Sequence, residues 1–253
     1  MCCFSGDVKW VGSTRIFARD AGDGARQLLA YSMSFEATSE LAMVLPLATA
    51  VGAGDDAVRF IDLSGYPTFF DDLDRAFPRP QARALSRGLA PASLDLAAKL
   101  VVHEVGHLEA SFVPSVSDFA RLDERFRLPK NAWDKLPVHR TYGFVVVKLA
   151  KSASKQNVHP IAFEFPRRDT SRLFFPTLHI HDGNVHKTAA FDHSLYAQLA
   201  IDRPSAMNEG WMPSMAPIAP FVEESRAKGL VVAAKQAYKR TIVGGATNDD
   251  TWF

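Results

Sequence analysis

The stretch "TRIFARDAGDGARQLLAYSMSFEA", residues 14–37, indicates the class of fold. Two extended and partly alternating segments, 14–20 and 26–37, flank the connection "AGDG". Gly and Asp accept the backbone angles of a tight turn, so this arrangement is typical of a β-hairpin. We therefore expect an antiparallel pair of strands here.

Further segments extend this pattern along the chain. Residues 142–150, 159–166 and 173–181 are rich in Val, Phe and Ile and are predicted to be strands. The apolar run 41–49 is predicted to be a further strand, with Pro46 at a sheet edge or a strand end. Residues 67–77 and 115–126 place apolar residues at helical spacing, and so does the longer stretch 220–245. We predict an α+β fold, mainly antiparallel β-sheet with a few short helices and one C-terminal helix.

The chain is predicted to be a single domain, 1–253. Its apolar content of 47% permits a large core for a chain of this length. The segment 78–91, with its Pro and Arg residues, is predicted to be a mobile loop, and 246–253 a polar C-terminal tail.

The charge balance excludes a non-specific binder of nucleic acid, because 29 basic residues face 28 acidic ones and no basic block occurs. No apolar run approaches the roughly 20 residues of a membrane helix, and no signal peptide is apparent. The only cysteines, Cys2 and Cys3, are adjacent and cannot staple a fold. We expect a cytoplasmic protein that binds neither nucleic acid nor membrane.

The stretch "TLHIHDGNVHK", residues 177–187, is the first functional signal. "DGN" favours a tight turn, and alternate strand residues share a face, so His179, His181 and His186 are predicted to cluster on one hairpin. Such a cluster can bind a transition metal, with His193 as a fourth ligand. The alternative is an exposed hairpin that carries histidines and binds nothing.

Three imidazoles suit zinc, copper or iron, and we expect zinc or copper with water in the remaining position. The His-x-His strand resembles carbonic-anhydrase-like and cupin-like sites, without the glutamate that follows the pair in cupins. The resemblance implies a metalloenzyme that acts on a small-molecule substrate.

A second signal is "VVHEVGHLEASF", residues 101–112. His103, Glu104 and His107 match the H-E-x-x-H pattern and resemble zincin metalloproteases, in which the histidines bind zinc and the glutamate activates water. That chemistry requires a helix, whereas the β-branched residues and Gly106 favour strands.

A third signal is Cys2, which becomes the first residue if Met1 is removed. A thiol beside a free α-amine, followed by "FARD" with Arg19 and Asp20, resembles N-terminal-nucleophile hydrolases. The resemblance implies that Cys2 is the nucleophile and that Arg19 and Asp20 lie near it.

The order of blocks also resembles a bacterial family of unknown function. The blocks are an N-terminal cysteine, the "MVLP" strand, "FFDDLDRAF", "VHEVGHLEASFVP", "YGFVVVKLA" and "HPIAFEFP". The resemblance implies that the "VHEVG" block forms strands, and it implies no activity. We predict a transition-metal-binding protein; the alternatives are a Cys2 hydrolase, a zincin-like protease and a non-catalytic binding protein.

Overall fold

The hairpin predicted at residues 14–37 is present in the computed structural model. The structure describes residues 3–78, 109–128, 134–136, 138–180, 184–200 and 203–253. In it, β2 (Trp10–Asp20) pairs antiparallel with β3 (Arg26–Ala37). The turn between them uses Gly22 and Gly24 at positive φ, a conformation that costs glycine little.

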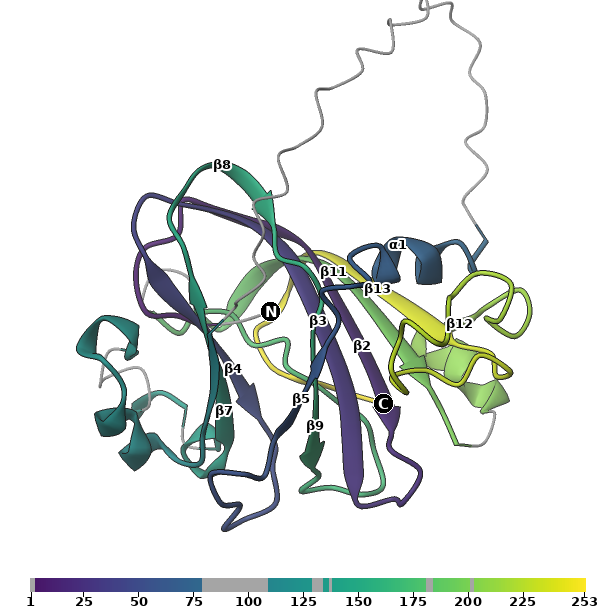
Figure 1. Cartoon of the computed structure of the whole chain (residues 1–253), viewed down its shortest axis with the longest axis horizontal. Coiled ribbons are helices and arrows are strands. Elements are labelled where there is room, and N and C mark those ends of the chain that lie inside the picture. The colour runs from purple at the N-terminus through teal and green to yellow at the C-terminus, as the bar shows by residue number, and fades with distance from the viewer. Residues whose placement is uncertain (1–2, 79–108, 129–133, 137, 181–183, 201–202) are drawn as a thin grey trace, which may run out of the picture.

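Strands dominate the described residues, and they form two main sheets (Figure 1). All the strand pairs in these sheets are antiparallel except β11 with β2. The eight-stranded sheet has the spatial order β12 (Met212–Pro213), β13 (Tyr238–Thr247), β11 (Thr188–Gln198), β2, β3, β9 (Ile161–Pro166) and β5 (Arg59–Asp62), with β8 (Ser152–Asn157) also paired to β3. The four-stranded sheet has the order β1 (Cys3–Phe4), β4 (Leu41–Leu47), β7 (Gly143–Leu149) and β6 (Ala110–Val113).

The remaining elements are short. A separate two-stranded sheet joins β10 (Phe174–Phe175) to β14 (Thr251–Trp252), so part of the predicted polar tail is a strand, and the final Phe253 is buried. The helices that lie wholly within the described residues are α1 (Phe69–Asp74) and the 3₁₀ helices η1 (Val116–Arg121), η2 (Glu124–Phe126), η3 (His139–Thr141) and η4 (Pro204–Glu209). None of the described helices is long and apolar enough to span a membrane.

Two apolar clusters cover opposite faces of the large sheet. Along β2, Ile16 and Ala18 belong to the main cluster between the two sheets, whereas Phe17 belongs to a second cluster on the opposite face. This alternation is the ordinary period of a strand buried on both sides. The second cluster is covered by α1 and by parts of the segment 216–237.

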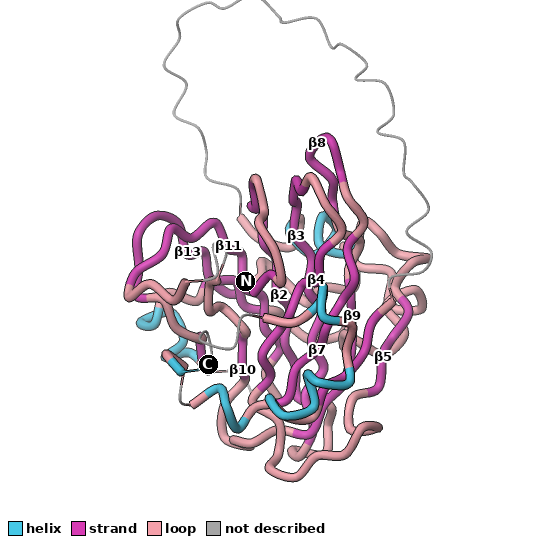
Figure 2. The backbone as a smooth tube through the Cα atoms, turned by 90° about the vertical axis from the view of Figure 1, so that its left-hand side faces the viewer, coloured by secondary structure: helices cyan, strands magenta, loops and turns pink. Residues whose placement is uncertain are grey.

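The prediction of an α+β fold with a C-terminal helix is wrong, because the protein is mainly β (Figure 2). Lys228 and Gly229 both have positive φ, which interrupts a helix. The Arg19 guanidinium donates to the carbonyls of Gly229 and Leu230 at 2.7 and 3.0 Å. The apolar residues with helical spacing therefore pack on the sheet as irregular chain, and Tyr238 begins β13.

Other local predictions have mixed outcomes. The strands predicted at 41–49, 142–150 and 159–166 are confirmed as β4, β7 and β9, and the helix within 67–77 is confirmed as α1. The helix predicted at 115–126 is instead the two 3₁₀ helices η1 and η2. The loop predicted at 78–91 falls almost wholly outside the described residues.

Candidate functional site

The predicted histidine hairpin is not formed over its described residues. Residues 176–179 and 184–187 have no strand structure, and Ile180 makes a single bridge to Cys3. His179 and His193 are buried, and their rings stack at 5.1 Å between centroids with 26° between planes. His186 is exposed, and His181 lies outside the described residues.

The prediction of a metal-binding histidine cluster is contradicted. Within the described ranges, no group of three or more His, Cys, Asp or Glu residues is placed to hold a metal ion. Of the four predicted ligands, His179 and His193 stack on each other, His186 is exposed, and His181 lies outside the described residues. The ring of His179 packs also on Phe191, which makes this a mainly structural contact.

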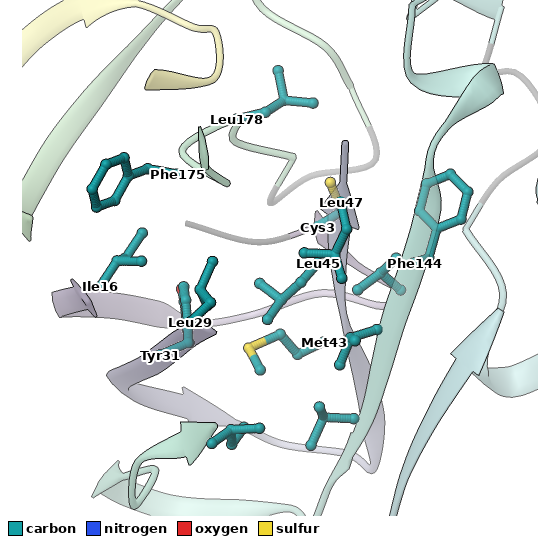
Figure 3. Packing of buried hydrophobic residues seen from close by; sticks show 14 of the residues in the cluster. Cys3, Ile16, Leu29, Tyr31, Met43, Leu45, Leu47, Phe144, Phe175 and Leu178 are labelled. Atoms are coloured by element: carbon teal, nitrogen blue, oxygen red, sulfur yellow. The ribbon is translucent and has the colours of Figure 1, made fainter. Parts of the chain in front are cut away.

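The structure does not describe the residues of the two alternative catalytic sites. Cys2, His103, Glu104 and His107 lie outside the described residues. Cys3 is fully buried in the main cluster (Figure 3).

Arg19 and Asp20, which the hydrolase resemblance places near the nucleophile, have structural contacts of their own. Arg19 alternates with Ala18 and shares the face of Phe17, so its side chain lies on the opposite side of the sheet from the cluster that contains Cys3. Asp20 forms an ion pair with Arg167 at 2.6 Å. Both residues hold chain segments together.

A groove of about 380 Å³ lies where the edges of the two sheets approach each other. β5 is the last strand of the large sheet, and β6 is the last strand of the small one. The lining is Asp55, Val58, Phe60, Ala110, Ser111, Phe112, Val113, Pro114, Asp118, Arg121 and Leu122. The groove therefore combines an apolar lining with two sheet edges.

The hydrogen bonds of β6 define which of its backbone groups face this groove. Lys148 N–H of β7 donates to the Glu109 carbonyl at 3.0 Å, and Ser111 and Val113 are aligned with Val146 and Phe144. In an antiparallel ladder the paired residues alternate, so Ala110 and Phe112 turn their N–H and C=O groups away from β7. Among the strands that the structure describes, none pairs with this side of β6, which therefore presents an open edge.

The apolar lining depends on the ring of Phe112. A Cβ built on Gly143 would lie 2.6 Å from this ring, so the glycine at the start of β7 leaves the space that the ring occupies. Phe60 is 39% exposed and packs edge-on against Phe163, with centroids 6.1 Å apart. The side chains of Phe60 and Phe112 are thus both held in place at the groove by packing against neighbouring residues.

The charged side of the groove is formed by Asp55, Asp118 and Arg121. The Arg121 guanidinium donates to both oxygens of Asp55, at 2.8 and 2.6 Å, and lies 3.5 Å from Asp118. These hydrogen bonds lower the pKa of the Asp55 carboxyl and raise the pKa of Arg121, so both are charged at neutral pH. Two carboxylates and one guanidinium leave the groove with a net negative charge.

A second concavity, of about 360 Å³, lies on the uncovered part of the large sheet. Its polar groups largely bind one another: Ser13 N–H donates to Asp192 at 2.8 Å, and Ser34 hydrogen-bonds Asn157. Arg15 forms an ion pair with Asp71. This concavity is polar and self-paired, in contrast to the groove at β6.

The geometry defines a mainly β protein with two packed sheets and an open edge strand in an apolar, acidic groove. No family model matches the chain. The crystal structure of baculovirus P35 is similar to it with 12% identity and a TM-score of 0.48, over 99% of this chain and 98% of that chain. A mutated baculovirus P35 after caspase cleavage is similar with 15% identity and a TM-score of 0.41, over 79% of this chain and 70% of that chain. P35 in its complex with caspase-8 is similar with 13% identity and a TM-score of 0.40, over 79% of this chain and 69% of that chain.

Sequence reasoning did not find the groove. The signal was present in "EASFVP", residues 109–114, which directly follows the H-E-x-x-H pattern. Residues 110–113 are a strand, whereas the "VHEVG" block at 102–106 lies outside the described residues. This strand lies at the end of a sheet because of the order in which the strands pair. A local sequence pattern does not reveal that order.

Proposed function

We propose that this protein is a non-catalytic binding protein that takes an extended segment of a partner protein along the open edge of β6. The observation that carries the proposal is the pair of outward-facing residues, Ala110 and Phe112, inside an apolar groove. Strand addition is an established mode of peptide recognition, in which backbone hydrogen bonds give affinity and side-chain pockets give specificity.

The backbone groups of β6 supply the first part of the binding energy. The two N–H and two C=O groups of Ala110 and Phe112 can form up to four hydrogen bonds with an added strand. Each contributes a net of about 0.5–1.5 kcal/mol. Alternate side chains of the added strand would lie against Val58, Phe60 and Leu122, which line the same groove.

The charge of the groove favours a partner segment with a basic residue beside its apolar ones. Arg121 already neutralises one carboxylate, which leaves the excess negative charge of Asp55 and Asp118. A lysine or arginine at the end of the added strand would lower the repulsion between these carboxylates, whereas an acidic residue would add to it.

The test is a binding measurement with two fluorescein-labelled peptides, KVTVTVK and its acidic counterpart EVTVTVE. Fluorescence anisotropy should show saturable binding of the basic peptide with a dissociation constant below about 1 mM, and at least about threefold weaker binding of the acidic one. The modest affinity follows from the ordering cost of a free peptide. Failure of both peptides to bind below that limit would remove the proposal.

The Ala110→Pro variant identifies the binding edge. Proline removes an N–H that points away from β7, so the ladder within the sheet is retained and the variant should unfold at the wild-type temperature. Peptide affinity should fall by about tenfold, the loss expected for one hydrogen bond and the proline ring in its place. The matched control Ala110→Ser keeps the N–H and should bind like the wild type; equal binding by Ala110→Pro would place the peptide elsewhere.

We further propose that the protein acts in the cytoplasm. The chain has two cysteines, and they are adjacent, so a disulfide between them cannot join distant segments of the chain. Proteins of oxidising compartments commonly rely on disulfides that join distant segments. Fractionation of cells that express the chain, with a thiol-labelling readout for Cys3 after unfolding, should find the protein reduced in the cytoplasmic fraction.

A further inference from the structure

The outer side of β13 is a second open edge, at the other end of the large sheet. β12 pairs with only two residues of this strand, Tyr238 and Lys239. β11 pairs with the strand over its length, from Tyr238 to Thr247. Within the described part of the chain, no strand pairs with the outer side of residues 240–247. Figure 2 places β13 and β5 on opposite sides of the molecule, as their positions at opposite ends of the sheet require.

Two hydrogen bonds fix which backbone groups this edge exposes. Ser214 N–H donates to the Ala237 carbonyl on the β12 side at 2.7 Å, and Asn248 N–H donates to the Lys187 carbonyl on the β11 side at 3.0 Å. Because the direction alternates along a strand, Thr241, Val243 and Gly245 point their N–H and C=O groups away from β11.

The side chains of this edge do not protect it. The stretch "TIVGGAT", residues 241–247, contains no charged residue and no proline, which are the usual devices that prevent edge pairing. Val243 is 73% exposed, although its side chain is apolar. A Cβ on Gly244 or Gly245 would meet nothing within 4 Å, so the surface beside Val243 is open.

We propose that β13 pairs with β13 of a second copy of this chain, antiparallel and about a two-fold axis at Gly244. An isologous contact of this kind requires a self-complementary surface. In this register the exposed Val243 side chain lies opposite Gly245 of the second copy, where no side chain obstructs it. The large sheets of the two copies then form one continuous sheet.

The order of charges along the chain supports pairing of β13 with a second copy of the chain, in preference to pairing with an unrelated strand. Arg240 precedes the uncharged stretch, and Asp249 follows it. Antiparallel pairing about Gly244 brings Arg240 of each copy to Asn248 of the other, with Asp249 next to it. Parallel self-pairing would place like charges together, so the charges select the antiparallel arrangement.

The dimer is expected to be weak. A single pair of short strands buries less than the roughly 1,200 Å² of a standard stable interface, so association in the micromolar range or weaker is expected. The contact is independent of the groove at β6, because it uses the opposite edge of the large sheet.

Sedimentation velocity of the full chain, from about 1 to 300 µM, tests the proposal. The wild type should shift from the mass of one 27.8 kDa chain toward twice that mass as concentration rises. Val243→Pro removes an outward N–H and should stay monomeric, whereas the matched control Val243→Thr keeps the N–H and should dimerise. Val243→Lys places two charges near the axis and should dissociate the dimer more at low salt than at high salt.

Thermal unfolding of each variant at a concentration where all are monomeric serves as the folding control, and Val243 is exposed enough that the unfolding temperatures should agree. A wild type that stays monomeric throughout the range would overturn the proposal. Dimerisation of Val243→Pro and Val243→Lys equal to that of the wild type would equally overturn it, because the interface would then lie elsewhere.

Discussion

Gly143→Ala tests whether the space beneath Phe112 shapes the groove. The added Cβ would lie 2.6 Å from Cε2 and Cζ of the Phe112 ring and 3.0 Å from Oγ1 of Thr49. Thr49 cannot easily retreat, since its Oγ1 accepts the Gly143 N–H at 3.1 Å. The Phe112 ring is therefore the group that must move.

The contacts around Gly143 permit an estimate of how much Gly143→Ala lowers the free energy of unfolding. A methyl group forced into a filled space costs about 1–3 kcal/mol of the free energy of unfolding. Because the Phe112 ring lines the groove, its displacement should also weaken binding of the KVTVTVK peptide. One substitution outside the lining thus alters both stability and recognition.

A double-mutant cycle with Phe112→Leu separates this clash from other effects of the substitution. The smaller side chain relieves the contact, so the two substitutions together should destabilise the protein less than the sum of the two, by about 1 kcal/mol or more. Urea unfolding of the four proteins gives the values. Strict additivity, or an unchanged peptide affinity in Gly143→Ala, would refute the role assigned to Phe112.

Two further predictions concern buried polar groups. The Asp250 carboxylate lies 2.8 Å from Nε2 of His139 and accepts hydrogen bonds from the backbone N–H groups of Thr177 and Leu178. Asp250→Ala should therefore lower the free energy of unfolding, measured in urea, by about 3–5 kcal/mol. A decrease below about 1 kcal/mol would contradict this. Burial raises the pKa of Tyr66 and of Tyr142 to about 12, from 10.0 in the unfolded chain. The unfolded tyrosines lose their protons first, so their contribution to stability is complete below pH 10.0 and is lost as the pH rises toward about 12. Tyrosinate absorbance with circular dichroism across this range is the check, and titration of these two residues near pH 10.0 in the folded protein is the contrary result.

The strands could be predicted from the sequence because their signals are local. In the hairpin of β2 and β3, the alternation of apolar residues and the glycines of the turn act within a few residues of one another. The helical spacing near Leu230 is equally local, and it misleads because Arg19, 211 positions away, binds the carbonyl of that residue. A side chain distant in sequence thus overrides the local preference.

The predicted histidine hairpin is not formed over its described residues for a similar reason. A tight turn is favoured by "DGN", but the chain before it is drawn into the core, where Ile180 bridges Cys3 and His179 stacks on His193. Asn248 holds this conformation, since its side chain accepts the His179 N–H at 2.7 Å and donates to the His179 carbonyl at 3.0 Å. Contacts with Cys3 of β1 and with Asn248 therefore determine the conformation of residues 179–180, which the local sequence does not specify.

The two open edges differ in a way that assigns them different partners. The edge at β6 lies in a groove with aromatic side chains and an excess of carboxylates, which suits a partner strand of different composition with a basic residue. The edge at β13 is uncharged over 241–247 and has opposite charges beyond its two ends, which suits a copy of itself. The groove at β6 also contacts β5, which lies at the opposite end of the large sheet from β13. Because the two edges share no residue, the two equilibria should be uncoupled. The affinity for KVTVTVK should therefore be the same in the wild type at dimer-forming concentrations and in monomeric Val243→Pro; a difference of more than about threefold would mean that dimerisation and groove binding are linked.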